Sequence, residues 1–360
     1  MNHAKHFRVI GIVVFGIICL GVLIGTLAAG VLPKLPPKHS PQPPMQRLFD
    51  EILRSELEVY RTNPGELEQL HVGTNIDEVL VRTNSKRQTI RSAIRSGMNL
   101  SLRRADDLAD YILIEHCYAS QSIQTGKIDE AVDSVRYVLQ VLGQQSPRLA
   151  APIRLKTLDV LQEVLASPRC EKRHVQELYD ILFNQLEHWS SDTAIWSQYQ
   201  DEEKELYEEI LRSSFENALS PEDFNKLLQA GAFKVFETQP MRKLALDQLA
   251  FLNTMESVIA SCNMPYYERA DSLTAIFSKT QPVIAELLLR EIPQEMYRIA
   301  LDRTQCESVC LAMSIVLHGQ GKNAVKEKLT GNPFIVKLLP NGIMVSYRDS
   351  VKPFYVQNYP

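Results

Sequence analysis

The chain from Met45 to about Lys328 repeats its apolar residues at the three- and four-residue spacing of an amphipathic helix. Short breaks with helix-ending residues, among them Asn63-Pro64 and Gly126, separate these stretches. The pattern predicts helices over residues 48–60, 108–124, 127–142, 170–188, 193–217, 241–261, 265–278 and 282–317, and further helices that begin at Ser146-Pro147 and Ser220-Pro221. We therefore expect a mainly α fold in which residues 45–328 form an irregular domain of stacked helical hairpins.

The end of the chain changes from helical spacing to the alternation of a β-strand. Phe334 to Leu339 alternates, Asn341-Gly342 is a strong signal for a two-residue hairpin turn, and Ile343 to Tyr347 forms the return strand. Residues 352–356 are expected to add a short third strand. Because an isolated hairpin is only marginally stable, residues 329–360 should form a small β-hairpin unit that packs against the helix ending near Leu317.

Residues 9–32 form an apolar segment of 24 residues without a charge. At about 1.5 Å per residue, a helix of this length crosses a hydrocarbon core of about 30 Å. We expect a single transmembrane helix that anchors the protein in the lipid bilayer. Within it, Gly21, Gly25 and Ala29 recur every four residues, and such a small-residue face lets two membrane helices pack closely. The alternative is a cleaved signal peptide with its cleavage site at Ala28-Ala29-Gly30, although the apolar region of such peptides is usually shorter.

Basic residues flank this segment on both sides, so their distribution does not settle its orientation. They are Lys5 and Arg8 before the segment and Lys34, Lys38 and Arg47 after it. We expect residues 1–8 to be a cytoplasmic tail, because so few residues are too short for an exported domain, and the body to be extracytoplasmic. Residues 33–44 contain six prolines, which exclude helix and sheet and predict an extended spacer between anchor and body.

Composition supports the helical prediction and narrows the classes of function. Five of the 15 glycines lie in the first thirty residues, so the body has few of the residues that tight turns and glycine-rich catalytic loops require. The hydrophobic content of 45% and the charged content of 23% are typical of an ordinary globular protein. The net charge of −4 gives no basis for specific nucleic-acid binding.

No sequence motif for catalysis or cofactor binding is complete. HExxH and GxSxG are absent, and His318-Gly-Gln-Gly-Lys322-Asn323 lacks the first glycine and the Ser or Thr of a phosphate-binding loop. Cys306 and Cys310 lie one helical turn apart, but His318 falls elsewhere on the helix surface and no further pair completes a zinc site. We therefore assign no catalytic, cofactor-binding or metal-binding residues. The five cysteines outside the membrane segment are expected to pack in the core.

Two charge clusters are the least ordinary features of the body. Residues 81–104 contain seven basic residues and no acid, and Arg87, Arg91 and Arg95 recur every four residues on one predicted helix face. Residues 201–209 contain six acids. Three hypotheses follow: two solvated faces, a salt-bridge seam between the clusters, or an interaction patch at the arginines for anionic lipid or another polyanion. An exposed stripe predicts that Arg91→Gln combined with Arg95→Gln leaves stability unchanged and weakens binding.

One helix pair has the features of a repeat. Gly126-Lys-Ile-Asp-Glu-Ala131-Val resembles the middle of a tetratricopeptide repeat, where the glycine turns the chain and the alanine lets two helices approach closely. No second copy occurs at a period of about 34 residues. We therefore expect one repeat-like hairpin within an irregular helical domain.

Three short motifs point to a known kind of layout. They are Met264-Pro265-Tyr266-Tyr267-Glu268, Asn332-Pro333-Phe334 and Gly342-Ile-Met-Val-Ser346-Tyr347. With the order of segments, they resemble a group of uncharacterised bacterial envelope proteins that have one N-terminal membrane helix, a helical repeat-like body and a pseudopilin-like C-terminal hairpin. The chain lacks the Thr-Gly that usually follows Pro-Phe in that group, and has Ser-Tyr in place of Tyr-Ser. The resemblance implies an architecture and no chemistry.

The sequence as a whole predicts a membrane-tethered interaction or scaffolding protein on the extracytoplasmic side, with a protein partner. The alternatives are a membrane-anchored enzyme and a solute-binding module, each with a site assembled from dispersed residues. A deep cleft where Glu, His and Arg converge would favour the enzyme, and a large apolar pocket would favour the solute-binding module. An interaction protein predicts a groove or a flat patch instead.

Overall fold

The structure is a computed structural model that describes residues 84, 87, 88, 91, 92, 105–212, 240–279, 282–319, 326–347 and 353–358. These residues belong to one compact unit, residues 52–360. The predicted membrane segment 9–32 with Gly21, Gly25 and Ala29, the spacer 33–44 and Arg95 all lie outside the described residues. Within the described ranges, no helix is long and apolar enough to span a membrane.

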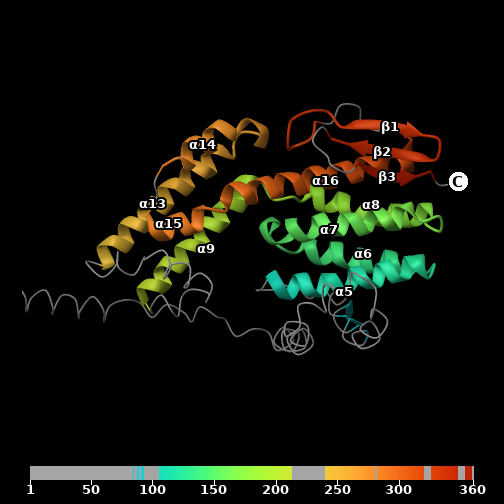
Figure 1. The fold of residues 1–360 in the computed structure, drawn as a ribbon, viewed down its shortest axis with the longest axis horizontal. Helices are drawn as coiled ribbons and strands as arrows, with labels where there is room; N and C mark the ends of the chain where they lie inside the picture. Colours follow the sequence, from blue (N-terminus) through green and yellow to red (C-terminus); the bar gives the residue numbers. More distant parts are fainter. Residues whose placement is uncertain are drawn as a thin grey trace, which may run out of the picture. The chain divides into compact units, whose positions relative to one another are not determined.

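The described residues are mainly helical and end in a small antiparallel sheet (Figure 1). The helices are α5 (Ala105–Gln124), α6 (Ile128–Gly143), α7 (Pro147–Ala166), α8 (Lys172–Glu187), α9 (Asp192–Arg212), α13 (Pro240–Ser261), the 3₁₀ turn η1 (Tyr266–Glu268), α14 (Ala270–Phe277), α15 (Val283–Leu289) and α16 (Ile292–His318). The strands are β1 (Ile335–Leu339), β2 (Gly342–Ser346) and β3 (Phe354–Gln357). The apolar spacing therefore predicted the helical class and most of these elements correctly.

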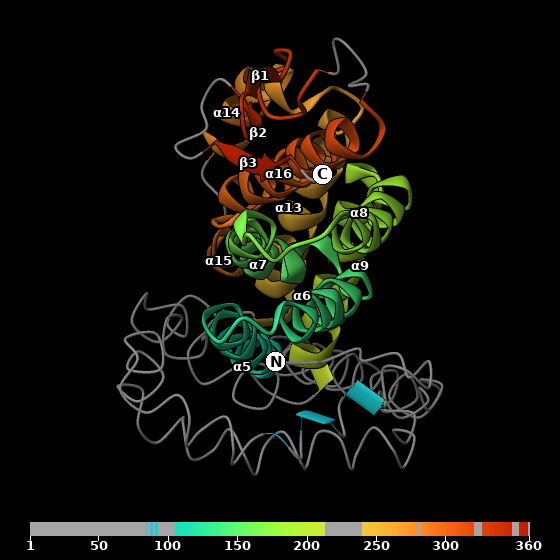
Figure 2. The same cartoon turned by 90° about the vertical axis from the view of Figure 1, so that its right-hand side faces the viewer.

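Two hydrophobic cores organise the elements, and α16 takes part in both. The first core is formed by residues of α5, α6, α7, α8, β2, β3 and the C-terminal half of α16. The second is formed mainly by α9, α13, α15 and the N-terminal half of α16. Around the first core, the sheet, α16, α7 with α8, and α6 with α5 follow one another as layers (Figure 2).

The α5–α6 hairpin turns at Gly126, as the sequence predicts. Its φ of +76° lies in the left-handed region that favours glycine. A Cβ atom there would overlap the guanidinium group of Arg169, which donates a hydrogen bond of 2.8 Å to the Gly126 carbonyl. Ala119 and Ala131 are fully buried on the two helices. The resemblance of this hairpin to a tetratricopeptide repeat stays a prediction.

The helix predicted over residues 282–317 is in fact two helices. α15 ends at Leu289 and α16 begins at Ile292. Pro293 explains the break, because it has no N–H to donate and its ring would clash with the Leu289 carbonyl in a continuous helix. The predicted helix over residues 265–278 likewise divides into η1 and α14.

The C-terminal sheet has the strand order β1-β2-β3, which confirms the predicted hairpin and third strand. β2 and β3 pack on α16, as expected for strands that are not stable alone. The turn differs from the prediction: Leu339 pairs with Gly342, so the loop residues are Pro340 and Asn341. Gly342 instead allows β3 to pass close by, since a Cβ atom there would lie 2.4 Å from the Val356 carbonyl oxygen.

Candidate functional site

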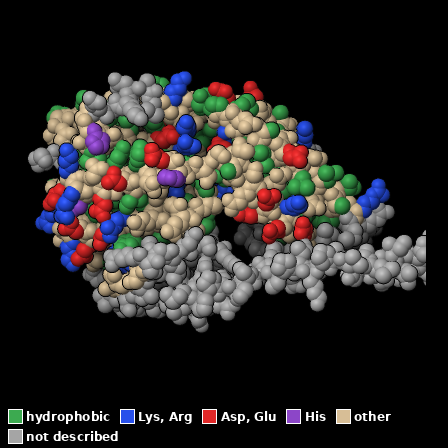
Figure 3. Space-filling model, turned by 180° about the vertical axis from the view of Figure 1, so that it is seen from behind, with side chains coloured by type: hydrophobic (Ala, Val, Ile, Leu, Met, Phe, Trp, Pro, Cys, Tyr) green, Lys and Arg blue, Asp and Glu red, His purple; other side chains and the backbone are tan. Residues whose placement is uncertain are grey.

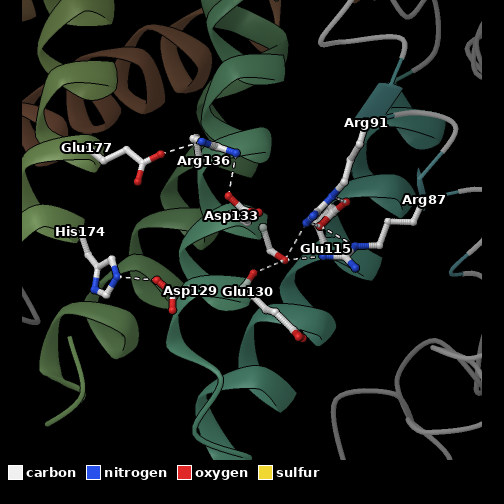
Figure 4. A network of polar contacts seen from close by, with 10 residues as sticks. Arg87, Arg91, Glu115, Asp129, Glu130, Asp133, Arg136, His174 and Glu177 are labelled. Carbon is white, nitrogen blue, oxygen red and sulfur yellow. Dashed lines mark hydrogen bonds and ion pairs between the residues drawn. The ribbon is translucent and has the colours of Figure 1, made fainter. Parts of the chain in front are cut away.

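The first two arginines of the predicted stripe are buried: Arg87 is 7% exposed and Arg91 is 4% exposed. Their common partner is the fully buried Glu115 of α5. The Glu115 Oε2 atom lies 2.9 Å from Arg87 Nε and 2.7 Å from Arg91 Nη2. Both guanidinium groups also donate to Ser134 Oγ on α6, at 2.7 Å and 2.8 Å. We name these four residues the Glu115 cluster (Figure 4).

Aromatic rings enclose the Glu115 cluster. The guanidinium carbon of Arg87 lies 3.7 Å from the Tyr118 ring centroid, and that of Arg91 lies 4.6 Å from the Tyr137 ring centroid. The Tyr111 hydroxyl donates to Glu115 Oε1 at 3.1 Å, and burial, followed by the charge of Glu115, raises the pKa of Tyr111 well above its ordinary value. The phenol therefore stays a neutral donor. These contacts are those of a structural ion-pair cluster that holds Arg87 and Arg91 against α5 and α6.

This arrangement corrects the expected exposure of the stripe for Arg87 and Arg91. Their carboxylate partner lies on α5 and is not part of the acidic run 201–209, so the hypothesis of a seam between the two clusters is wrong for these two arginines. Because Arg91 is buried and paired, we now expect Arg91→Gln to destabilise the fold. Arg95 lies outside the described residues, so the interaction patch as a whole stays a prediction.

The acidic run lies on α9 and is mostly solvated, with Asp201, Glu202 and Glu205 exposed. Its one aromatic residue, Tyr207, is fully buried and donates a hydrogen bond of 2.8 Å to Asp247 Oδ1. The acidic run therefore combines an exposed charged face with a residue of the second core.

Further pairs join α6 and α8 beside the Glu115 cluster. Arg136 of α6 bridges Asp133 and Glu177, each at 2.6 Å (Figure 4). His174 Nδ1 accepts a hydrogen bond from the Glu171 amide, so its Nε2 donates to Asp129 Oδ1 at 2.9 Å. His174 lowers the pKa of Asp129. The carboxylate side chains of these pairs are each 40% exposed or more, although His174 is buried, so the pairs contribute little to stability.

A second buried ion pair joins α7 to α16. Arg154 Nη1 lies 2.6 Å from Asp302 Oδ2, and the same guanidinium group donates to the Leu142 carbonyl oxygen at 3.2 Å. Complete burial raises the pKa of Asp302 to about 6, and the attraction of Arg154 offsets only part of this effect. This pair too lies inside the packed body.

Cys306 and Cys310 are buried on α16 and carry free thiols. Burial raises the pKa of both thiols, which keeps them protonated and unreactive. The His318 ring packs edge-on against Tyr179, with the ring centroids 6.0 Å apart. Among the described residues, no three His, Cys, Asp or Glu side chains lie close enough to hold a metal ion.

A shallow groove of about 770 Å³ lies between α6 and α8. Polar side chains such as Gln140, Gln144, Asn184 and Gln185 line it together with Tyr137 and Ile181. No Glu or His side chain lines the groove, so it lacks the convergence of Glu, His and Arg that would favour an enzyme.

The most exposed apolar feature of the described residues is β1. Its four apolar side chains are all exposed: Ile335 at 46%, Val336 at 41%, Leu338 at 76% and Leu339 at 38%. β1 is an edge strand, and within the described ranges only β2 pairs with it along its length. Among the described strands, one edge of β1 therefore has no partner and carries large apolar side chains, which is an arrangement that can bind another strand.

The two edges of the sheet differ in how they are covered. β3, at the other edge, packs on α7 and α16, buries Phe354 and Val356, and donates from Gln357 to the Ser167 carbonyl oxygen at 2.6 Å. Val336 and Leu338 lie on the same face of the sheet as their partners Val345 and Ile343. The partners are buried on the helices, whereas the β1 side chains are not. β1 thus extends the apolar face of the sheet beyond the helices that cover it.

The alternation of residues 334–339 predicts β1 as a strand but does not predict its exposure. The signal was available in the consecutive apolar pairs Ile335-Val336 and Leu338-Leu339, which place apolar side chains on both faces of one strand. By contrast, Figure 3 shows Lys and Arg side chains interspersed with Asp and Glu on the face that it displays, so no single charge dominates there. We therefore take the free edge of β1 as the candidate functional site.

Comparison of the chain with protein-family models, with curated proteins and with solved structures found no match. The function must therefore be argued from the chain itself.

Proposed function

We propose that the chain is a membrane-tethered scaffolding protein that binds an extended segment of a partner protein at the free edge of β1. Residues 9–32 anchor it with the N-terminus in the cytoplasm, and the proline-rich spacer holds the body away from the bilayer on the extracytoplasmic side. The observation that carries the proposal is the apolar edge strand with all four of its large apolar side chains exposed.

The physical basis of this binding is the addition of a strand to the sheet. A partner segment in extended conformation would form main-chain hydrogen bonds with β1 and cover part of Val336 and Leu338. The body supplies a rigid support, because β2 and β3 are fixed on α16. An ordered edge avoids much of the entropy cost of binding, so a short partner segment suffices.

Site-specific crosslinking in the native cells tests the proposal. A photoreactive amino acid at Leu338 should give a light-dependent adduct with another protein, and Val336→Lys should reduce that adduct. The control position is Leu249 on α13, which is 53% exposed but does not lie on a strand edge. Equal adducts at both positions, or none at Leu338, would contradict the proposal.

The proposed topology has its own test. Protease added to spheroplasts should digest residues 45–360 and leave the anchor, because the body lies outside the cytoplasmic membrane. Full protection of the body in sealed spheroplasts would overturn the orientation but not the binding at β1. Intact mass measurement of the purified chain would show cleavage near Ala29 if the segment is a signal peptide.

A solute-binding module is the second candidate function, and the α6–α8 groove is the observation that favours it. Amide side chains on both walls suit a neutral ligand rich in hydroxyl or amide groups. A screen of such solutes should then find one that raises the melting temperature of the wild type but not of Gln140→Leu combined with Asn184→Leu. Equal shifts in both proteins would exclude the groove as the site.

A further inference from the structure

Charge is distributed unevenly around the candidate site. Within residues 326–347 and 353–358, Lys326, Lys328 and Lys337 are exposed, and the one acid is Glu327. Glu327 is 1% exposed, and its carboxylate accepts hydrogen bonds from the Leu329 and Thr330 amides. The described surface of this region is therefore basic, although the whole chain has a net charge of −4.

Lys337 occupies the centre of β1, and its cross-strand partner in β2 is Met344. Among the described residues, Lys337 forms no ion pair with a carboxylate, whereas Arg303 pairs with Glu307 at 3.2 Å. A residue placed opposite Lys337 on the free side of β1 would lie on the same face of the sheet. Opposite charges in such a position stabilise strand pairing, and like charges weaken it.

We infer that the segment bound by β1 carries a carboxylate opposite Lys337 and apolar residues on either side of it. The inference rests on the proposed function and adds the chemistry of the partner. The apolar residues match Val336 and Leu338, and the carboxylate supplies the charge that this edge lacks. A second copy of the chain fits less well, because pairing β1 in register with another β1 would set Lys337 against Lys337.

Binding of three synthetic peptides to the full-length protein in detergent tests the inference. The peptides share one strand-forming apolar sequence and differ only in the central residue, which is Glu, Gln or Lys. We expect the affinity to fall from Glu to Gln to Lys, by about twofold to fivefold at each step. Added salt should reduce the differences, since the pair is exposed.

Substitution of the lysine gives the decisive comparison. Lys337→Glu should reverse the order of the three peptides, whereas the matched control Lys326→Glu should preserve it. Lys337 is exposed, so unchanged melting temperatures would show that both variants fold. Equal affinities for the three peptides, together with an adduct at Leu338 in cells, would overturn the inference and leave the proposed function in place.

Other outcomes would show that the free edge of β1 binds something other than a peptide segment. Failure of all three peptides to bind would overturn the proposed function as well as the inference. Binding of wild type to vesicles with anionic lipid, lost in Leu338→Glu and without any peptide binding, would assign the edge to a membrane surface. Concentration-dependent dimers that Leu338→Lys dissociates would assign it to a second copy.

Discussion

The Glu115 cluster and β1 reverse the usual relation between polarity and burial. The cluster places two guanidinium groups and a carboxylate in the interior, where each charge has a partner. β1 places four large aliphatic side chains at the surface, where each is exposed by between 38% and 76%. Buried charges require partners for stability, whereas neighbouring apolar side chains exposed on an edge strand are a typical feature of contact surfaces. The comparison therefore separates a structural cluster from the candidate binding site.

The largest expected effect is that of Glu115→Gln. The substitution removes the one carboxylate that neutralises two buried cations, so we expect the free energy of unfolding to fall by about 3–5 kcal/mol. Urea denaturation followed by circular dichroism measures this change. The control is Glu130→Gln on α6, whose side chain is 61% exposed and pairs with the exposed Lys127, and which should change stability by less than about 0.5 kcal/mol. Equal effects of the two substitutions would mean that the cluster is not closed to solvent.

The next largest loss of stability is expected at Ile343 of β2, whose cross-strand partner in β1 is Leu338. Ile343 is 5% exposed and pairs with Leu338, which is 76% exposed. Ile343→Ala should lower the free energy of unfolding by about 2–4 kcal/mol, and Leu338→Ala by less than about 0.5 kcal/mol. The same urea titration measures both. A large loss for Leu338→Ala would show that β1 packs against part of the chain and has no free edge.

A smaller effect is expected in the pH dependence of stability, which the buried Arg154–Asp302 pair should influence. Because burial raises the pKa of Asp302 from 3.8 to about 6, the folded chain between these values keeps a proton that the unfolded chain has released. The stability of the wild type relative to Asp302→Asn should therefore fall as the pH rises through this range, and then level off.

Asp129→Asn is the matched control for that titration. His174 lowers the pKa of Asp129, so this carboxylate contributes stability that is present above its ordinary pKa and is lost as the pH falls. The stability of the wild type relative to Asp129→Asn should therefore rise with pH, opposite to the trend for Asp302. The change should also be smaller, because the Asp129 side chain is exposed. Parallel slopes for the two variants would contradict the role of burial at Asp302.

The last expected effect concerns the chemical reactivity of buried thiols and involves no change in the stability of the fold. Burial raises the pKa of the Cys306 and Cys310 thiols, so iodoacetamide at pH 8 should leave both unmodified in the folded chain and modify them in urea. A cysteine introduced by Leu338→Cys should react at once under native conditions, since that position is exposed. Mass spectrometry of the alkylated peptides measures the three positions together.

The sequence predicts the parts of this fold that depend on local chemistry. Helical spacing, Gly126 and the alternation near the C-terminus define elements because each signal acts within a few residues. The break at Pro293 is also local, but the apolar pattern on both sides of it continued without interruption and hid the break. The anchor, the spacer and Arg95 lie outside the described residues, so those expectations stay predictions.

The candidate site could not be predicted in the same way, because it depends on contacts that are distant in sequence. Arg87 lies 28 residues from Glu115, and nothing in the spacing of the arginines indicates that partner. The exposure of Leu338 depends on how far the helices extend beneath the sheet, which the pattern of one strand does not contain. Local sequence therefore specified the elements, and tertiary contacts decided which of them face solvent.

Helix α16 has a consequence for how the two cores unfold. It has 27 residues, which corresponds to about 40 Å of helix, and it contributes side chains to both cores. Loss of either core would remove packing partners from the same rigid helix and so weaken the other. Hydrogen exchange at α13 and at β2, which belong to different cores, should therefore proceed through one global opening with a shared free energy. A partner bound at β1 would then slow exchange throughout the body, including at helices that it never touches.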